Sequence, residues 1–289
     1  MLGCSVVATR QTDGATLLEP IVLGVVQGAT EFLPISSSAH LRIAGEFLPS
    51  ARDPGTAFTA ITQIGTEVAV LVYFRRDIAR IISRWARSLA GKLPQNDPDA
   101  RLGWQVIIGT IPIGLAGYLA QNQIRSAFRS LKLTAVVLIV FGVALGVADR
   151  IGAGTRELKD FTLSDGLLCG LAQALALIPG VSRSGATTTM GLALGFERPA
   201  AAEYAFLLAV PAVFASGLFE LRESLRRPGP YSLKRTALAT CISFAVGFAT
   251  ISLLMRFISR RSFLPFSLYR VVLGAKLLVL ISKGILQSR

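Results

Sequence analysis

Two short polar segments interrupt apolar stretches of this chain, and they carry matching residues at an offset of 146 positions. At that offset Gln27 aligns with Gln173 and Ser36 aligns with Ser182. Charges and hydroxyl clusters are costly at membrane depth, so such residues inside apolar sequence indicate a functional site. Two such segments at corresponding places in two halves of a chain predict a single site formed where the halves meet.

The first segment contains an isolated carboxylate. Gln27 and Glu31 are four residues apart and share one face of a helix, and Glu31 is the only formal charge between Glu19 and Arg42. One interpretation is a buried glutamate paired with an arginine for structure. The alternative is an acid–base group or a metal ligand, since Mg²⁺ and Ca²⁺ prefer oxygen ligands and often bridge to phosphate. Gln27 could then add a carbonyl oxygen to the same site.

Three serines, residues 36–38, follow Pro34 and precede a second short helix. One of them is expected to cap that helix, and capping alone would explain the group. His40, however, is the only histidine in the chain and lies one helical turn after Ser37. A histidine near a hydroxyl can activate it or protonate a leaving group, so this pair is a candidate for chemistry.

The second segment has the features of an anion site. Ser182, Arg183 and Ser184 follow Pro179 and open a predicted helix. Free N–H groups at a helix N-terminus attract anions, and the arginine fork matches phosphate oxygens. Thr187 lies one turn further on. An arginine buried only for packing would not recover its desolvation cost, so we expect it to bind phosphate or a similar anion. Together the two segments suit phosphoryl transfer, which depends on positioning and charge stabilisation.

The composition indicates where these segments lie. Hydrophobic residues make up 52% of the chain and charged residues 16%, and the mean hydropathy is +0.57. A soluble domain has about 25% charged residues, so the chain is predicted to be an all-α integral membrane protein. The net charge of +13 is expected in loops against anionic headgroups and not on a nucleic-acid surface. The three cysteines share no spacing, which argues against a disulfide framework or zinc site.

Six apolar runs are long enough to cross a bilayer. They are 57–74, 103–120, 133–149, 202–219, 236–255 and 264–282. Two further runs, 19–48 and 164–195, are broken at Pro34 and Pro179, and each predicts a helix–break–helix segment that re-enters the membrane on one side.

Each half of the chain would then hold one re-entrant helix–loop–helix and three transmembrane helices. Because three is odd, the second half is predicted to be inverted relative to the first, which makes an inverted-topology repeat. We place the halves at about 18–149 and 164–283 within a single membrane domain, 18–289, after a disordered lead, 1–17.

Two features of the basic residues stay open at this stage. Lysine and arginine are almost equally numerous on the two predicted faces, although the arginine-rich segment 75–101 weakly favours a cytoplasmic position. That segment suits a solvated loop or an amphipathic interfacial helix. Arg270 and Lys276, in the last span, could reach the membrane surface, pair with Glu203 or line the cavity.

These motifs resemble those of the bacterial undecaprenyl-diphosphate phosphatases linked with bacitracin resistance, over residues 18–286. Residues 27–37 are similar to the family's (Glu/Gln)-x-x-x-Glu motif and its following serines. Residues 179–187 are similar to its Pro-Gly-x-Ser-Arg-Ser-x-x-Thr motif, and residues 263–270 to a segment near its C-terminus.

The resemblance implies hydrolysis of a C55 polyprenyl diphosphate to the monophosphate and phosphate, with a divalent cation, Mg²⁺ or Ca²⁺. It implies that Ser37 is the nucleophile, that His40 is its acid–base partner, and that Glu31 and Arg183 complete the catalytic set. Glu31, with Gln27, would hold the metal. Because Gln27 is a neutral variant of the motif, any base or strong ligand role falls on Glu31. The substrate-binding residues would be Gln27, Ser36, Ser182, Ser184 and Thr187.

The resemblance also implies a multi-pass protein of the bacterial plasma membrane whose active site faces the outer side. Its expected partners are the polyprenyl diphosphate and membrane lipids, with a homodimer left open and no nucleic acid. Lipid phosphatases that need two histidines are excluded by the single His40. A transporter or flippase of an anionic polyprenyl phosphate lipid is the alternative, because inverted repeats and broken helices are transporter architecture.

Overall fold

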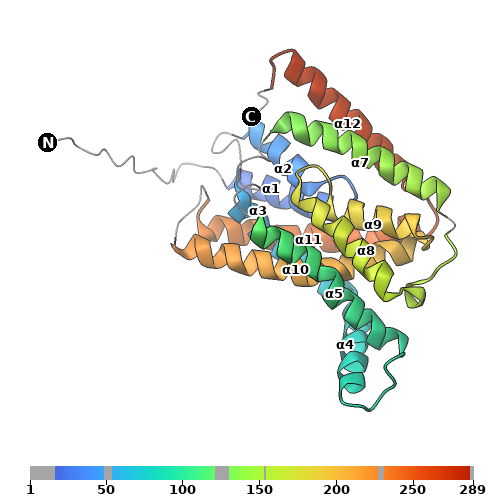
Figure 1. Cartoon of the computed structure of the whole chain (residues 1–289). Helices are drawn as coiled ribbons and strands as arrows, with labels where there is room; N and C mark the ends of the chain where they lie inside the picture. The colour runs from blue at the N-terminus through green and yellow to red at the C-terminus, as the bar shows by residue number, and fades with distance from the viewer. Residues whose placement is uncertain (1–16, 49–53, 121–129, 153, 227–230, 287–289) are drawn as a thin grey trace.

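The computed structural model describes residues 17–48, 54–120, 130–152, 154–226 and 231–286, and this part of the chain is helical, with one isolated β-bridge and no strand. The predicted lead 1–17 falls outside it except for Leu17. Figure 1 shows the helices packed side by side in one body.

The first half contributes α1 (Leu18–Glu31), α2 (Ser37–Glu46), α3 (Thr56–Tyr73), α4 (Arg75–Leu89), α5 (Pro98–Leu119) and α7 (Leu131–Ile151). The second contributes the short η1 (Leu158–Asp160), α8 (Leu163–Ala174), η2 (Leu175–Leu177), α9 (Arg183–Ala193), α10 (Arg198–Arg226), α11 (Leu233–Ile258) and α12 (Leu264–Ser282).

Five helices are long and apolar enough to cross a membrane, namely α5, α7, α10, α11 and α12. They coincide with five of the six predicted spans. The sixth, 57–74, falls on α3, which reaches the required length only together with α4, and those two helices are bent by 79°. The chain is therefore built as a membrane protein, with α4 turned away from the direction of α3.

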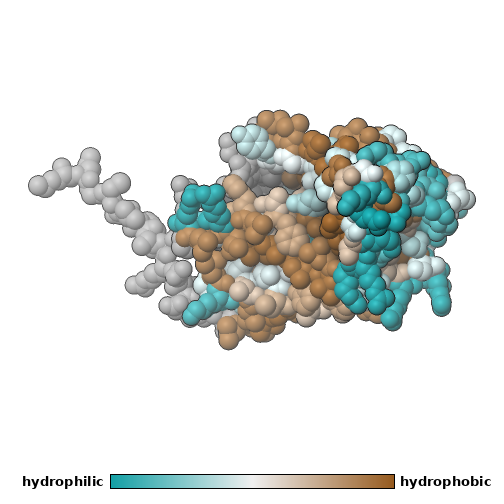
Figure 2. Space-filling view, turned by 90° about the horizontal axis from the view of Figure 1, so that it is seen from below, coloured by the Kyte–Doolittle hydropathy of each residue, from teal (hydrophilic) through white to brown (hydrophobic). Residues whose placement is uncertain are grey.

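The outer surface agrees with a lipid environment. Large apolar side chains are exposed along α5, α7, α11 and α12, including Ile111, Val140, Leu253 and Val272, each more than half exposed. Figure 2 shows apolar residues across the middle of one face, with hydrophilic residues gathered mainly at one end. Soluble monomers rarely expose apolar area on this scale, because water would penalise it.

Glycines let the helices approach closely. In α1, a methyl group at Gly24 would meet the carbonyl oxygen of Ala239 at 2.7 Å, and one at Gly28 would meet that of Ser243 at 2.8 Å. In α8, a methyl group at Gly170 would collide with the backbone of α5. Small residues spaced four apart allow such contacts between membrane helices, so α1 lies against α11 and α8 lies against α5.

Both predicted breaks are present. The first separates α1 from α2 at residues 32–36, and the second separates η2 from α9 at residues 178–182. The proline in each break cannot continue the hydrogen-bond ladder, and a serine caps the helix that follows. These two loops place the polar residues of the candidate site.

Candidate active site

The two serines that begin the second helix of each pair share an uncommon backbone conformation. Ser36 has φ of 74° and Ser182 has φ of 70°, and they are the only non-glycine residues with positive φ in the described part of the chain. Each hydroxyl accepts a backbone N–H three residues on, from Ala39 at 3.4 Å and from Gly185 at 3.1 Å. Such strained conformations cluster at functional sites, where the surrounding structure maintains them.

Each capping serine also bonds to the serine two residues later. The Oγ atoms of Ser36 and Ser38 are 3.2 Å apart, and those of Ser182 and Ser184 are 3.3 Å apart. The two breaks therefore repeat one arrangement of hydroxyls at the offset seen in the sequence.

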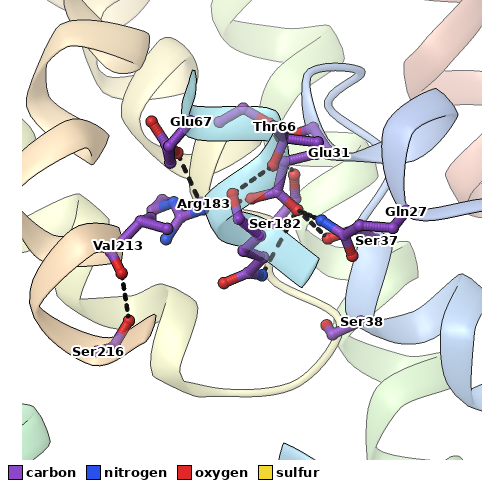
Figure 3. Close-up of polar contacts among 12 residues, drawn as sticks. Gln27, Glu31, Ser37, Ser38, Thr66, Glu67, Ser182, Arg183, Val213 and Ser216 are labelled. Carbon is purple, nitrogen blue, oxygen red and sulfur yellow. Dashed lines mark hydrogen bonds and ion pairs between the residues drawn. The ribbon is translucent and has the colours of Figure 1, made fainter. Parts of the chain in front are cut away.

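Glu31 joins the two breaks. One of its carboxylate oxygens, Oε2, accepts the Ser37 hydroxyl at 2.5 Å and the Gln27 amide at 2.7 Å, and the other, Oε1, forms an ion pair with Arg183 (Figure 3). The backbone carbonyl of Glu31 accepts the Ser184 hydroxyl at 3.1 Å. Glu31 is only 8% exposed, so its charge is held by these groups and not by water. The pairing with an arginine that the sequence allowed is present, whereas the acid–base or metal-ligand role of Glu31 stays a prediction.

A second carboxylate, Glu67 in α3, lies on the other side of the arginine. Its Oε1 is 3.6 Å from Arg183, and its Oε2 is buried without a hydrogen-bond partner. Sequence analysis missed this residue, although it is the only formal charge in the span 57–74. The rule that drew attention to Glu31 would have found it, because an isolated carboxylate inside a span indicates function by default. Gln63, one turn earlier, also reaches Glu31, at 3.5 Å.

His40 has partners other than Ser37. Its Nδ1 lies 2.7 Å from the Ser36 carbonyl oxygen, and its Nε2 lies 2.7 Å from the Tyr269 hydroxyl, with the two rings stacked. A carbonyl can only accept, so the geometry assigns the proton to Nδ1 and leaves Nε2 to accept from the tyrosine. Within the described residues Ser37 bonds to Glu31 and makes no hydrogen bond to His40. The serine–histidine pair predicted from the sequence is therefore near in space but not joined.

Arg270 is fully buried and holds the backbone of both breaks. It donates to the carbonyl oxygen of Pro34 at 3.0 Å in the first break, and to those of Gly180 at 2.8 Å and Val181 at 2.9 Å in the second. Of the three roles left open by the sequence, the structure excludes pairing with Glu203 and reach to the surface. An arginine with five donors can satisfy carbonyls that a broken helix leaves without partners.

Several buried polar atoms around this network have no hydrogen-bond partner in the described part of the protein. They include Gln27 Oε1, Glu67 Oε2, Thr187 Oγ1 and both amide atoms of Gln173. Burying such an atom alone costs about 1–3 kcal/mol, so a bound polar group or water that reached these atoms would be favoured. Thr187 is thus placed beside the predicted anion site without joining the Glu31 network.

The donor set fits a hard cation better than a zinc-type metal. No group of three or more histidine, cysteine or acidic side chains in the described residues is arranged to hold a metal. The oxygens without a hydrogen-bond partner among the described residues are Glu67 Oε2 and Gln27 Oε1, and Glu31 adds a carboxylate that Arg183 and Ser37 already contact. Mg²⁺ is usually held by one or two carboxylates together with water and substrate phosphate, which matches this set.

Comparison with known proteins identifies the family. Residues 20–276 match the model described as bacitracin resistance protein BacA. The chain belongs to this family. The undecaprenyl-diphosphatase of Micrococcus luteus is 60% identical over 276 residues, covering 94% of this chain and 100% of the relative. That of Clavibacter michiganensis is 62% identical over 267 residues, covering 92% and 97%. Undecaprenyl-diphosphatase 2 of Streptomyces coelicolor is 54% identical over 280 residues, covering 93% and 96%. The family resemblance seen in the sequence is confirmed.

Proposed function

We propose that this protein hydrolyses undecaprenyl diphosphate to undecaprenyl phosphate and inorganic phosphate, and so recycles the lipid carrier of cell-wall synthesis. Identities of 60% and 62% to undecaprenyl-diphosphatases, over nearly the whole chain, support this activity. The observation that carries it is the Glu31 carboxylate, which joins a hydroxyl from one break to an arginine from the other inside an apolar helical body. Bacitracin resistance is an attribute of the family to which the chain belongs.

Ser37 is proposed to attack the terminal phosphorus. Its hydroxyl already donates to Glu31 at 2.5 Å, so the carboxylate takes the proton as the serine oxygen forms its bond to phosphorus. The phosphorus–oxygen bond to the lipid phosphate breaks, and undecaprenyl phosphate leaves. Water then hydrolyses the phosphoserine, which releases phosphate and restores the serine hydroxyl. In the alternative route Glu31 takes the proton from water that attacks phosphorus directly.

Arg183 and the N-terminus of α9 are proposed to bind the diphosphate. The Arg183 side chain is 15% exposed and held between two carboxylates, which keeps the guanidinium oriented before substrate arrives. Ser182, Ser184 and Thr187 lie on the first turns of the same helix, where N–H groups and hydroxyls face an anion. Gln27 and Ser36 contribute from the first break. His40 is proposed to protonate the leaving phosphate as an imidazolium, after substrate displaces its contact with Tyr269 and Nε2 takes up a proton from water.

A divalent cation, Mg²⁺ or Ca²⁺, is proposed at Glu31 with Gln27, and the unpartnered oxygen of Glu67 extends the ligand set. The two carboxylates beside Arg183 would repel an anionic substrate unless their charge is offset. A bound cation would offset that charge and stabilise the charge that develops on the phosphoryl oxygens.

The finer architecture is proposed to be an inverted repeat with two re-entrant segments. The ends of the α8–α9 segment are bonded to each other, because Glu197 donates to the Arg156 carbonyl at 2.9 Å and Thr155 donates to that of Gly195 at 3.2 Å. A segment that crossed the bilayer would have its ends on opposite sides. The helix pairing is also symmetric: α1 packs on α11 as α8 packs on α5, and α3 pairs with α10 as α7 pairs with α12.

The proposed location is the bacterial plasma membrane, with the active site open to the outer side, as the family resemblance implies. The outward orientation stays a prediction from the family resemblance, and a homodimer stays open. A transporter or flippase of an anionic polyprenyl phosphate is the alternative function.

The deciding experiment is phosphate release from undecaprenyl diphosphate by the purified protein in detergent with Mg²⁺ or Ca²⁺. We expect Ser37→Ala, Arg183→Ala and His40→Ala each to abolish or strongly reduce release. Ser252→Ala, at a partly buried serine of α11 that bonds only within its own helix in the described residues, is the matched control and should retain activity. Movement of the lipid between liposome leaflets without phosphate release would replace the enzyme proposal with the transporter.

A further inference from the structure

Helix α4 leaves the helical body at a sharp angle. It begins one residue after α3 ends, and the two helices are bent by 79° at Phe74. Figure 1 shows α4 and the start of α5 extending from the body as a hairpin. With α3 crossing the bilayer in the proposed fold, a turn of this size lays α4 nearly parallel to the membrane surface.

One face of α4 is packed against α5. Ile81 and Ser88 are buried there, and Trp85 meets Trp104 of α5 with ring centroids 5.6 Å apart. Arg84 forms an ion pair with Asp97 at the beginning of α5. This face is occupied, so the rest of the helix surface is available to other partners.

A second face is apolar and exposed. Ala79, Ile82, Ala86 and Leu89 recur at three- and four-residue spacing, which aligns them along one side of the helix. Ile82 is 58% exposed and Leu89 is 52% exposed. Such a stripe is costly in water and does not take part in the packing on α5, so it indicates an apolar environment on that side.

A third face, next to the apolar one, is basic. Arg76, Arg80 and Arg87 are exposed along it. Arg80 pairs with Asp77 and Asp99, whereas Arg76 and Arg87 have no carboxylate within ion-pair distance among the described residues. Two unpaired arginines on one side of the helix attract an anionic surface.

We propose that α4 is an interfacial helix that binds the anionic headgroup layer of the membrane. The apolar stripe would enter the boundary between headgroups and acyl chains, and the arginines would contact lipid phosphates beside it. A water-exposed loop leaves the apolar stripe unexplained, and a helix buried in protein leaves the arginines unpaired. The adjacent stripes and the 79° turn together fit a lipid surface.

The chain itself supplies a local probe. Its two tryptophans, Trp85 and Trp104, both lie in this hairpin. Their fluorescence in proteoliposomes is to be measured with bromine-labelled phosphatidylglycerol and, separately, bromine-labelled phosphatidylcholine at equal mole fraction. We expect stronger quenching by the anionic lipid, and a smaller difference at high salt because exposed charges are screened. A Trp104→Phe variant assigns the signal to Trp85 in α4.

Two sets of variants separate the two stripes. Arg76→Gln with Arg87→Gln should remove the preference for anionic lipid, whereas Arg260→Gln with Arg261→Gln, at exposed arginines after α11, should leave it. Ile82→Gln with Leu89→Gln should reduce quenching by both lipids. Equal quenching by both lipids in the parent protein, or no quenching by either, would overturn the proposal. Phosphate release by the arginine variants in detergent checks that the catalytic site is intact, so failure here is distinct from failure of the proposed enzyme.

Discussion

At the scale of single residues, the site is organised by Glu31, which contacts side chains from both broken segments. The Ser37 hydroxyl and the Arg183 guanidinium meet on opposite oxygens of one carboxylate. This arrangement gives the serine a proton acceptor and gives the arginine a fixed direction without substrate. Preorganised charge of this kind is usually the largest contribution to catalysis.

Glu67 is expected to matter through its charge and not through its size. Glu67→Gln keeps the shape of the side chain but removes one of the two carboxylates beside Arg183. We expect the cation concentration that gives half-maximal phosphate release to rise about 10- to 100-fold, as for other changes around a metal site. Direct Mg²⁺ binding by calorimetry should weaken in parallel. Glu203→Gln, at another carboxylate of a long helix, is the control. An unchanged cation dependence for Glu67→Gln would remove this residue from the cation site.

The single histidine allows a direct test of its proton position. In protein labelled with ¹⁵N-histidine, the neutral ring should carry its proton on Nδ1, because Nδ1 faces the Ser36 carbonyl. Tyr269→Phe removes the hydroxyl at Nε2 and should increase the other tautomer, whereas Tyr118→Phe, at an exposed tyrosine, should not. Nitrogen chemical shifts distinguish the two forms. A wild-type ring protonated on Nε2 would contradict the assigned hydrogen bonds.

The sequence identified the residues of this site more easily than their pairings. Glu31 and Arg183 stand out because a charge inside apolar sequence needs a reason. The partner of His40 could not be predicted, since Tyr269 lies 229 residues away and reaches it only through the packing of α12. Ser37 and His40 are close in the sequence, yet the direction of each side chain depends on the positive φ of Ser36, which no local pattern indicates.

At the scale of elements, the α4–α5 hairpin is held by charge pairs outside the membrane. The Arg84 side chain donates hydrogen bonds to Asp97 and thereby lowers the pKa of that carboxyl from 3.8 to about 2, with the Ala100 backbone N–H adding to the effect. A lowered pKa means that the interaction stabilises the fold above the unfolded value. That stabilisation is present above about pH 4 and is lost as the pH falls toward 2.

Tryptophan fluorescence provides the test, because Trp85 and Trp104 contact each other in the same hairpin. We expect the emission to change as the pH falls from about 4 to about 2, and Asp97→Asn to weaken the hairpin already at neutral pH. Asparagine can still cap α5, so the expected loss comes from the charged contact with Arg84. Glu157→Gln, at an exposed carboxylate in another loop, should leave the acid transition unchanged. An Asp97→Asn protein with the wild-type transition would exclude Asp97 as its cause.

The membrane helices could be predicted from long, uniformly apolar stretches of sequence. The two breaks could be predicted from a proline that is followed within a few residues by serines. Pro112 and Pro211 remain inside α5 and α10, so proline alone does not end a membrane helix. Pro34 and Pro179 do so because polar residues that cap a new helix follow them. The bend between α3 and α4 was not predicted, since Phe74 carries no turn signal and the arginines after it suit a loop equally well.

At the scale of the whole molecule, the proposed topology places both ends of each broken segment on one side. In a cysteine-free background, Thr155→Cys and Glu197→Cys should react with a membrane-impermeant maleimide from the same side. Their backbones are joined through Arg156 and Gly195. Lys234→Cys, at the beginning of α11, should react from the opposite side, because α10 crosses the membrane between Glu197 and Lys234. Labelling of Thr155→Cys and Glu197→Cys from different sides would make α8–α9 a crossing segment and exclude the inverted repeat.

The position of Arg270 in α12 has a consequence for biosynthesis. The carbonyls of Pro34 and Gly180 share a donor in α12, which is synthesised after both loops. Until that helix inserts, these carbonyls lack the Arg270 guanidinium, so a polypeptide that stops before α12 cannot complete either loop.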